Sequence, residues 1–435
     1  MRKNNTVVDW CCSVRSKALR CPATVVQTGD IFRDGPKDHV HPSKPGLATA
    51  VKIMSQVKAR AKKEVFTSAA TIVQDVMRAN VETSAPDFSR PDLDNLVRRA
   101  NRTREKMRPK HPVDLADFEI NLDFLPENFF VGEARVDDRR HFIFATQDGL
   151  QTLCGAKRWY MDGTFKIVRA PFYQLLTVHA FITSGDVMKQ LPLAFILMSG
   201  KRKRDYSGVL SVLLEHLPRQ PKVNSVVVDF EAGLWQAIRE TLPDLDIHGC
   251  VFHWTQAVWR KAASIGLSAA YRHDDGTHEL IRMCLGLPFL PSAHIGQAFQ
   301  KLREQASTPL LEELMVYLEE TWINNPLWPT HSWSVFRQSI RTNNDVEGWH
   351  RRLNDQSPNG QLPFYVLVPL LHQEANLLPL QRKLVSEGKL CRRQRKTGQQ
   401  QRIFHLWDLY EAREIRSLRF LTKCGKIIGP IDKQT

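Results

Sequence analysis

Two aspartates occupy positions suited to chemistry at one end of a sheet. Asp162 lies in RWYMDGTFK (residues 158–166), an aromatic pattern that predicts a short strand before a glycine. Asp229 ends the segment VNSVVVD, whose valines predict a buried strand with a polar tip. Apolar runs at 172–184 and 191–199 predict two further strands paired beside the first. We therefore expect Asp162 in the middle of a sheet.

A glutamate is the third candidate for the same site. Glu347 lies in RTNNDVEGWHRRLN (residues 341–354), where Val346, Trp349 and Leu353 are spaced as one face of a helix. Two strand-borne aspartates and one helix-borne glutamate can share a pocket. Magnesium prefers oxygen ligands, and pairs of such ions promote phosphodiester transfer. As alternatives, an aspartate after a strand often caps the next helix, and a lone glutamate on a helix usually faces solvent.

Four segments carry a resemblance to a known family. They are MDGTFK at 161–166, VVDFEAGLWQAI at 227–238, GCVFHWTQAVWRK at 249–261 and NNDVEGWHRRLN at 343–354. In this order they resemble the Mutator-like element (MULE) transposases, from about residue 140 to residue 375. The resemblance implies an α/β, ribonuclease-H-like fold with a mixed sheet and a helical insertion. It also implies a DDE triad at Asp162, Asp229 and Glu347 that holds Mg²⁺ or Mn²⁺.

Four further residues are expected to support this triad. Cys250 and His253 mark the place of the family's Cys-x-x-His signature, and we interpret them as bracing the active site through packing or hydrogen bonds. The same pair is also half of a metal site, although two ligands alone do not hold zinc. Glu231 and His350 are close in sequence to the acids and are expected to orient them.

The N-terminal segment carries a second metal-ligand pattern. Cys12, Cys21, His39 and His41 supply two thiolates and two imidazoles, which are sufficient for tetrahedral zinc. So small a unit has few apolar residues for a core, so a metal would have to stabilise it. The spacing resembles the FLYWCH zinc finger, with a shortened front and with Cys11 as a spare thiol. Unrelated polar residues in a disordered arm are the alternative.

The charge balance indicates a polyanionic partner. The 435 residues include 61 Lys and Arg against 46 Asp and Glu, a formal net charge of +15. Nucleic acid is the usual partner of such an excess, a basic surface kept for solubility is the alternative, and double-stranded DNA is the partner that the MULE resemblance implies. A solvated loop or a nuclear localisation signal is the alternative for the basic run at 201–204. The candidate DNA-binding residues are Lys201, Arg202, Lys203, Arg204, Arg351 and Arg352.

The composition also limits the location of the protein. No apolar run is long enough to span a bilayer, and the first residues lack the apolar core of a signal peptide. The eight cysteines are unevenly spaced, which favours reduced thiols over a disulfide framework. We expect an intracellular, nuclear protein without a membrane, and self-association is expected from the class.

These patterns divide the chain into five regions. They are a FLYWCH-like finger at 1–45, a basic helical DNA-binding or linker region at 46–139, a catalytic domain at 140–261 and 336–375, a helical insertion at 262–335, and a basic tail at 376–435. We expect Trp322, Trp328 and Trp333 to pack the insertion against the sheet. The final prediction is a DNA transposase that cuts element ends and joins the 3′-hydroxyl to target DNA.

Two alternatives remain from the sequence. The first is a domesticated, transposase-derived DNA-binding or transcription-regulatory protein without mobility. The second is a zinc-finger protein with a helical interaction domain.

Overall fold

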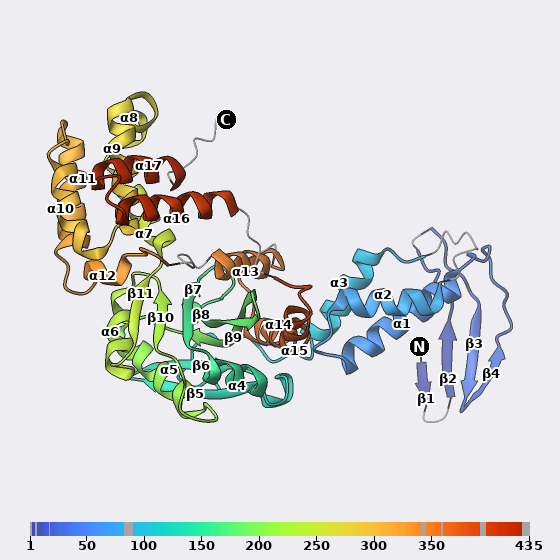
Figure 1. Ribbon diagram of the computed structural model, residues 1–435. Helices are drawn as coiled ribbons and strands as arrows, with labels where there is room; N and C mark the ends of the chain where they lie inside the picture. Colours follow the sequence, from blue (N-terminus) through green and yellow to red (C-terminus); the bar gives the residue numbers. More distant parts are fainter. Residues whose placement is uncertain are drawn as a thin grey trace. The chain divides into compact units, whose positions relative to one another are not determined.

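The computed structural model describes residues 2–4, 7–16, 18–81, 90–338, 340, 344–357, 360–391 and 397–428. The chain forms two compact units, Met1–Arg108 and Pro109–Thr435, which are considered separately (Figure 1). Arg341, Thr342 and Asn343, which belong to the fourth motif, lie outside the described residues.

The first unit combines a small antiparallel sheet with three helices. Its strands follow the order β1 (Arg2–Asn4), β2 (Val7–Cys11), β3 (Thr24–Thr28) and β4 (Ile31–Asp34), and its helices are α1 (Leu47–Lys63), α2 (Ala69–Asn80) and α3 (Leu93–Glu105). Among the described residues before α1, only Cys21 and Ala23 have buried apolar side chains. The small sheet therefore has almost no apolar core.

The three helices of this unit have a core of their own. Ile53 and Val57 of α1 pack with Ile72 of α2 and Leu96 of α3. Arg104, which is buried at the end of α3, donates hydrogen bonds to the carbonyl oxygens of Ala61, Glu64 and Thr67. These carbonyls end α1 and follow it, so one side chain satisfies acceptors that the helix leaves unpaired.

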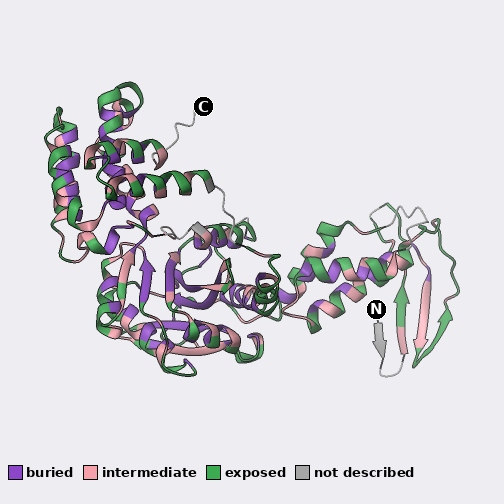
Figure 2. Cartoon of the chain, viewed as in Figure 1, coloured by how far each residue is buried: buried purple, intermediate pink, exposed green. Residues whose placement is uncertain are grey.

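A seven-stranded mixed sheet is the centre of the second unit. Its spatial order is β11-β10-β7-β8-β9-β6-β5. The strands are β5 (Phe130–Val136), β6 (Arg139–Phe144), β7 (Arg158–Thr164), β8 (Gln174–Ser184), β9 (Val187–Met198), β10 (Ser225–Val228) and β11 (Asp246–Gly249). Strands β7, β10 and β11 are parallel, whereas β8, β9, β6 and β5 continue as antiparallel neighbours. The central strands are mostly buried (Figure 2).

Helices cover both faces of this sheet. Trp159 and Met161 of β7 pack on the side of α4 (Gln147–Gly155), α5 (Lys203–Glu215) and α6 (Ala232–Thr241). Tyr160 belongs to a small cluster with Val346 of α13 (Asn344–Asp355). Because successive side chains of a strand alternate between faces, Asp162 lies on the same face as Tyr160.

A separate core lies on the sheet face opposite Trp159 and Met161 and includes α14 (Phe364–Ala375). Phe364 and Leu371 of α14 pack there with Phe195 of β9 and with Trp349 and Leu353 of α13. Helix α15 (Leu378–Ser386) follows, and Leu378 packs into the core beside α5 and α6. Helix α13 is thus fixed onto the sheet face that carries Asp162.

A second, helical core lies between the candidate second and third acids. It is built from α7 (Val251–Ser264), α8 (Leu267–His273), α9 (Asp275–Gly286), α10 (Ser292–Arg303), α11 (Pro309–Leu318) and α12 (Thr330–Trp333). Two short helical turns, Leu287–Phe289 and Glu319–Ile323, lie between these helices, and a third, Leu122–Phe124, precedes β5. Phe230 contacts Trp322 and Trp328, and Trp254 stacks on Trp333. The expected packing of these tryptophans is confirmed.

The region interpreted as a basic tail contains further helices. Helices α16 (Thr397–Glu411) and α17 (Ser417–Ile428) bury Ile403, Trp407 and Phe420 in the same core as α7 to α11. The Lys and Arg residues of 376–435 predict a basic tail, whereas the apolar residues at helical spacing in α16 and α17 decide the packing. Residues 392–396 lie outside the described residues.

One predicted strand is shorter than expected. The sequence at 246–253 predicts a single strand, but β11 ends at Gly249 and α7 begins at Val251. A side chain at position 249 would approach the Phe230 ring to 2.0 Å, which explains the glycine there. As a result, His253 lies on the first turn of α7 rather than on a strand.

Candidate active site and zinc site

The strand register brings the two aspartates to the same level of the sheet. Val227 of β10 pairs with Tyr160 of β7 in parallel, so Asp229, one residue after β10, is level with Asp162. Asp162 is 6% exposed, whereas the side chain of Asp229 is 47% exposed. The indole of Trp235 donates a hydrogen bond to the carbonyl oxygen of Asp229 at 2.8 Å. The β10–α6 turn is therefore fixed from within.

Asp229 does not cap the helix after it. Helix α6 begins at Ala232 with Glu231 at its N-cap position, and the Asp229 carboxylate instead accepts a hydrogen bond from the Phe230 amide at 2.6 Å. The helix-capping alternative is therefore wrong for this residue.

The charges of the three acids act on one another. Burial raises the pKa of Asp162 well above its usual range, and the charges of Asp229 and Glu347 raise it further. Burial and the charge of Asp229 raise the pKa of Glu347 to about 7, against the opposing charge of Arg351. Three acids from β7, the end of β10 and α13 thus share one environment, in which a cation would reduce their repulsion.

His253 lies between two of these acids. Its Nδ1 is 3.6 Å from Asp229 Oδ1, and its Nε2 is 3.7 Å from Glu347 Oε1. Both His253 Nδ1 and Glu347 Oε1 are buried, and within the described part of the chain neither has a hydrogen-bond partner. Burial lowers the pKa of His253, and Arg260 adds to this while Asp229 opposes it. The ring, which is carried by α7, therefore lies between Asp229 after β10 and Glu347 of α13.

Cys250 supports the site through packing. Its side chain is fully buried with Tyr160, Val227 and Val346, and its amide donates to the Val228 carbonyl at 3.0 Å. Among the described residues, no group of three or more ligand residues whose ligand atoms lie within 4.8 Å of one another includes Cys250 or the three acids. The metal half-site alternative at Cys250 and His253 gains no support.

A buried chain of polar side chains lies behind Asp162. His350 Nδ1 is 3.5 Å from Asp162 Oδ2, and His350 Nε2 is 3.3 Å from Thr177 Oγ1. Thr177 lies opposite Asp162 on β8 and is also 3.2 Å from the Asp162 carbonyl oxygen. His179 Nε2 is 3.0 Å from the same hydroxyl. Burial lowers the pKa of His350 to about 4, so its ring is neutral.

Glu231 belongs to a different polar group near Asp229. Burial raises the pKa of Glu231, a hydrogen bond from Tyr206 and the charge of Lys201 oppose this shift, and Asp229 adds to it. Gln174 donates to the Tyr206 hydroxyl at 2.6 Å. Glu231 is therefore held at the sheet end, where it adds negative charge beside Asp229.

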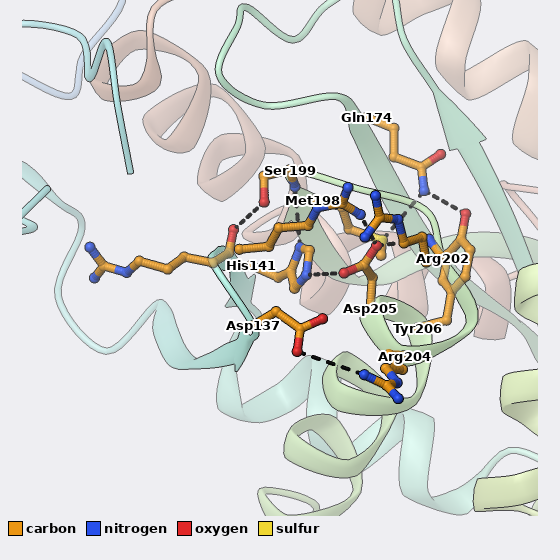
Figure 3. A network of polar contacts seen from close by, with 11 residues as sticks. Asp137, His141, Gln174, Met198, Ser199, Arg202, Arg204, Asp205 and Tyr206 are labelled. Atoms are coloured by element: carbon orange, nitrogen blue, oxygen red, sulfur yellow. Dashed lines mark hydrogen bonds and ion pairs between the residues drawn. The ribbon is translucent and has the colours of Figure 1, made fainter. Parts of the chain in front are cut away.

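The basic run at 201–204 is divided among several partners. The Arg202 amide donates to Asp205 Oδ2 at 2.7 Å, and Asp205 also contacts His141 Nε2 at 3.2 Å (Figure 3). Arg204 lies 3.8 Å from Asp137 in an ion pair (Figure 3). Lys203 lies 3.5 Å from Glu240.

The other predicted cations also differ from one another. Arg352 is paired with Glu374, which the Trp349 indole also contacts. Arg351 is exposed, and its charge acts on Glu347. Of the six candidate DNA-binding residues, Arg351 acts through its charge on Glu347 and Lys201 on Glu231, whereas Lys203, Arg204 and Arg352 are each paired with a carboxylate.

Sequence reasoning missed Thr177 and His179. Both lie in the apolar run at 172–184, where they were counted only as strand residues. Polar residues two apart in a run that is buried on both faces are a usable signal, because each must find a hydrogen-bond partner.

The four expected zinc ligands lie together in the first unit. The ligand atoms of Cys12, Cys21, His39 and His41 all lie within 4.8 Å of one another. Cys12 Sγ is 3.2 Å from His41 Nε2, Cys21 Sγ is 3.4 Å from His39 Nδ1, and the two ring nitrogens are 3.2 Å apart. Ligands around tetrahedral zinc are separated by roughly 3.3 to 3.8 Å, given metal–ligand distances of about 2.0 to 2.3 Å. Two thiolates and two imidazoles at these distances fit a zinc ion.

Comparison with known proteins identifies part of the second unit. Residues 158–257 match the family model described as the MULE transposase domain. This segment runs from β7 into α7 and includes Asp162, Asp229, Cys250 and His253. A search of curated proteins finds no match. The family match supports a transposase-family protein and implies DNA binding. Separately, no helix in the described residues is long and apolar enough to cross a membrane.

Proposed function

We propose that this protein is a DNA transposase of the MULE class, which cuts DNA at element ends and joins the freed 3′-hydroxyl to target DNA. The observation that carries the proposal is the approach of three acids from separate elements: the strand register sets Asp229 level with Asp162, and His253 lies 3.6 Å from Asp229 and 3.7 Å from Glu347. The family match at 158–257 contains the first two of these acids. The order of the sheet, with two parallel βα units after an antiparallel meander, is consistent with a ribonuclease-H-like fold.

The donor set fits a hard divalent cation. Mg²⁺ and Mn²⁺ prefer carboxylate oxygens, and Glu347 Oε1 is a buried carboxylate oxygen that accepts no hydrogen bond from the described residues. Asp162, Asp229 and Glu347 would hold such ions, which when bound would activate the oxygen nucleophile and offset the charge of the leaving oxygen. In hydrolysis, a water oxygen forms a bond to phosphorus, the bond from phosphorus to O3′ breaks, and O3′ takes up a proton.

The chain's own residues position these acids. His350 restrains the Asp162 carboxylate from the side of α13, and the strand register sets Asp229 level with it. His253 restrains Asp229 and Glu347 relative to each other, because its ring lies between them. In the first unit, we propose that Cys12, Cys21, His39 and His41 bind zinc in a FLYWCH-type finger that contacts DNA.

Strand cleavage tests the proposal. The substrate is duplex DNA that carries candidate terminal inverted repeats from either side of the gene, incubated with the full chain and Mg²⁺ or Mn²⁺. Asp162→Asn and Glu347→Gln should each reduce cleavage by at least about 100-fold. Asp345→Asn, on the same helical turn as Glu347 and 3.7 Å from Lys189, is the matched control and should retain activity.

Equal cleavage by wild type and Asp162→Asn would remove this acid from the chemistry. Tight DNA binding without any cleavage, together with the absence of repeats beside the gene, would favour the domesticated regulatory protein. Titration with Mn²⁺ provides a readout that does not depend on activity, because the two acid variants should bind the ion more weakly than wild type and Asp345→Asn.

A further inference from the structure

Two aromatic rings are half exposed beside the candidate active site. Phe165 and Tyr173 are each 46% exposed, whereas most large aromatic side chains of this sheet are buried. Phe165 follows β7 and is three residues after Asp162, and Tyr173 immediately precedes β8. The two ring centroids are 5.4 Å apart, with the planes at 82°. The edge of one ring therefore borders the face of the other, and apolar surface remains open to solvent.

A lysine from a third segment completes this surface. Lys201 Nζ is 6.0 Å from the centroid of Phe165 and 5.4 Å from that of Tyr173. Lys201 is exposed and follows β9, and its ammonium group is attracted by the electron-rich ring faces. A positive charge is therefore held at a fixed place over two exposed rings.

The backbone ties this surface to the turn that carries Asp229. A side chain at Gly233, on the first turn of α6, would come within 2.8 Å of the Lys201 carbonyl oxygen. The segment at Lys201 therefore packs directly against the start of α6, four residues after Asp229. Phe165 directly follows β7 and Tyr173 directly precedes β8, the two strands on which Asp162 and Thr177 are paired.

The surrounding charge favours an anionic ligand. Lys166, Arg169 and Arg202 are exposed residues of the same three segments. Bases of a DNA duplex are stacked on one another and cannot stack on a protein ring unless they are unpaired. Exposed aromatic side chains flanked by cations are the combination that binds single-stranded nucleic acid.

We propose that Phe165 and Tyr173 stack an unpaired base of the DNA strand next to the candidate active site, and that Lys201 binds a phosphate of the same strand. This inference rests on the proposed function, since it takes the DNA substrate from there. It adds a binding site for a locally opened strand, so the protein would act on ends whose terminal base pairs are frayed or opened.

Binding to forked DNA tests this site without any cleavage. The full chain is titrated, in EDTA-free buffer with Ca²⁺ in place of Mg²⁺, into a fluorescent duplex that ends in unpaired thymidines and into the fully paired duplex of the same length. Phe165→Leu and Tyr173→Leu should weaken binding of the fork by about 5- to 100-fold and leave binding of the paired duplex unchanged. Phe165→Tyr and Tyr173→Phe retain a ring and should bind the fork as wild type does.

Two further measurements locate the contact. A 5-iodouracil in the unpaired arm should crosslink on irradiation to the peptide that contains Phe165 or Tyr173. Lys201→Gln should reduce the slope of log affinity against log salt by about 1, as expected for one lost phosphate contact. Because the three substituted side chains are half exposed or exposed, circular dichroism and the melting temperature of all five variants should match those of wild type.

Equal affinity of the leucine variants and wild type for the fork would overturn the proposal, as would an equal loss for forked and paired DNA. Crosslinking only to other peptides would also overturn it. These outcomes are separate from failure of the proposed function, which is measured as cleavage by wild type and Asp162→Asn.

Discussion

Replacing Thr177 by valine should reveal how Asp162 is held in place. The Thr177 side chain is fully buried, and its hydroxyl contacts His350 Nε2, His179 Nε2 and the Asp162 carbonyl oxygen. Valine keeps the shape of threonine but removes the hydroxyl, so both histidine nitrogens lose this partner. Serine keeps the hydroxyl and removes one methyl group. The two variants therefore separate hydrogen bonding from volume.

The expected magnitudes follow from these contacts. A buried polar group without its partner costs about 1 to 3 kcal/mol, and two such groups result from Thr177→Val. Removal of the buried hydroxyl itself offsets part of this cost, which leaves a destabilisation of about 2 to 4 kcal/mol. Thr177→Ser should cost about 1 kcal/mol for the lost methyl group.

Urea unfolding of the full chain, followed by tryptophan fluorescence, measures the free energy of unfolding. The dependence of strand cleavage on Mg²⁺ concentration is the second readout, since a merely structural role would not change it. Thr177→Val should need more Mg²⁺ than wild type, because His350 no longer restrains the Asp162 carboxylate, whereas Thr177→Ser should not. If valine is tolerated as well as serine in both assays, the buried chain does not position Asp162.

Three further predictions concern other parts of the molecule. The purified protein should contain one zinc ion per chain in a colorimetric assay. Cys12→Ser should lose it and Cys11→Ser should retain it, since Cys12 belongs to the cluster of four ligand residues and Cys11 does not. Equal zinc contents of the two variants would contradict the ligand assignment. Burial lowers the pKa of His141, so the unfolded state binds the extra proton and stability should fall as the pH drops below about 6.5, by up to about 1.4 kcal/mol per pH unit. Urea unfolding at pH 7.5 and 5.5 should show a smaller loss for His141→Gln, and an unchanged loss would exclude this residue as a cause. Arg104→Met leaves three carbonyl oxygens without their donor and should destabilise the first unit by about 2 to 4 kcal/mol in a thermal melt, whereas Arg102→Met, at an exposed position of the same helix, should have little effect.

The sequence was sufficient to locate most elements of the sheet and the candidate catalytic and metal-ligating residues. The valines before Asp229 and the aromatic run around Asp162 are local patterns, and burial on both sides of a strand leaves a continuous apolar signal. The cysteines and histidines of the first unit could likewise be grouped from spacing and chemistry alone. The assignment of the acids as catalytic remains a prediction, which depends on the family resemblance.

The boundary at Gly249 shows where local patterns are ambiguous. A short apolar run such as Cys250–Phe252 fits either a strand or the first turn of a helix, and periodicity cannot distinguish them over so few residues. The structure resolves this ambiguity through a tertiary contact, because Gly249 packs against the ring of Phe230 from another segment and α7 then begins at Val251.

Local sequence determined which residues form strands and helices and which of them carry acids, thiols and imidazoles, because these properties depend on neighbours a few positions away. Only the tertiary structure decided that His253 lies between Asp229 and Glu347, that Thr177 connects His350 to Asp162, and that Lys201 lies over Phe165 and Tyr173. Those contacts depend on strand register and on the packing of α7 and α13, which are set by the whole core and leave no periodic signal in the sequence.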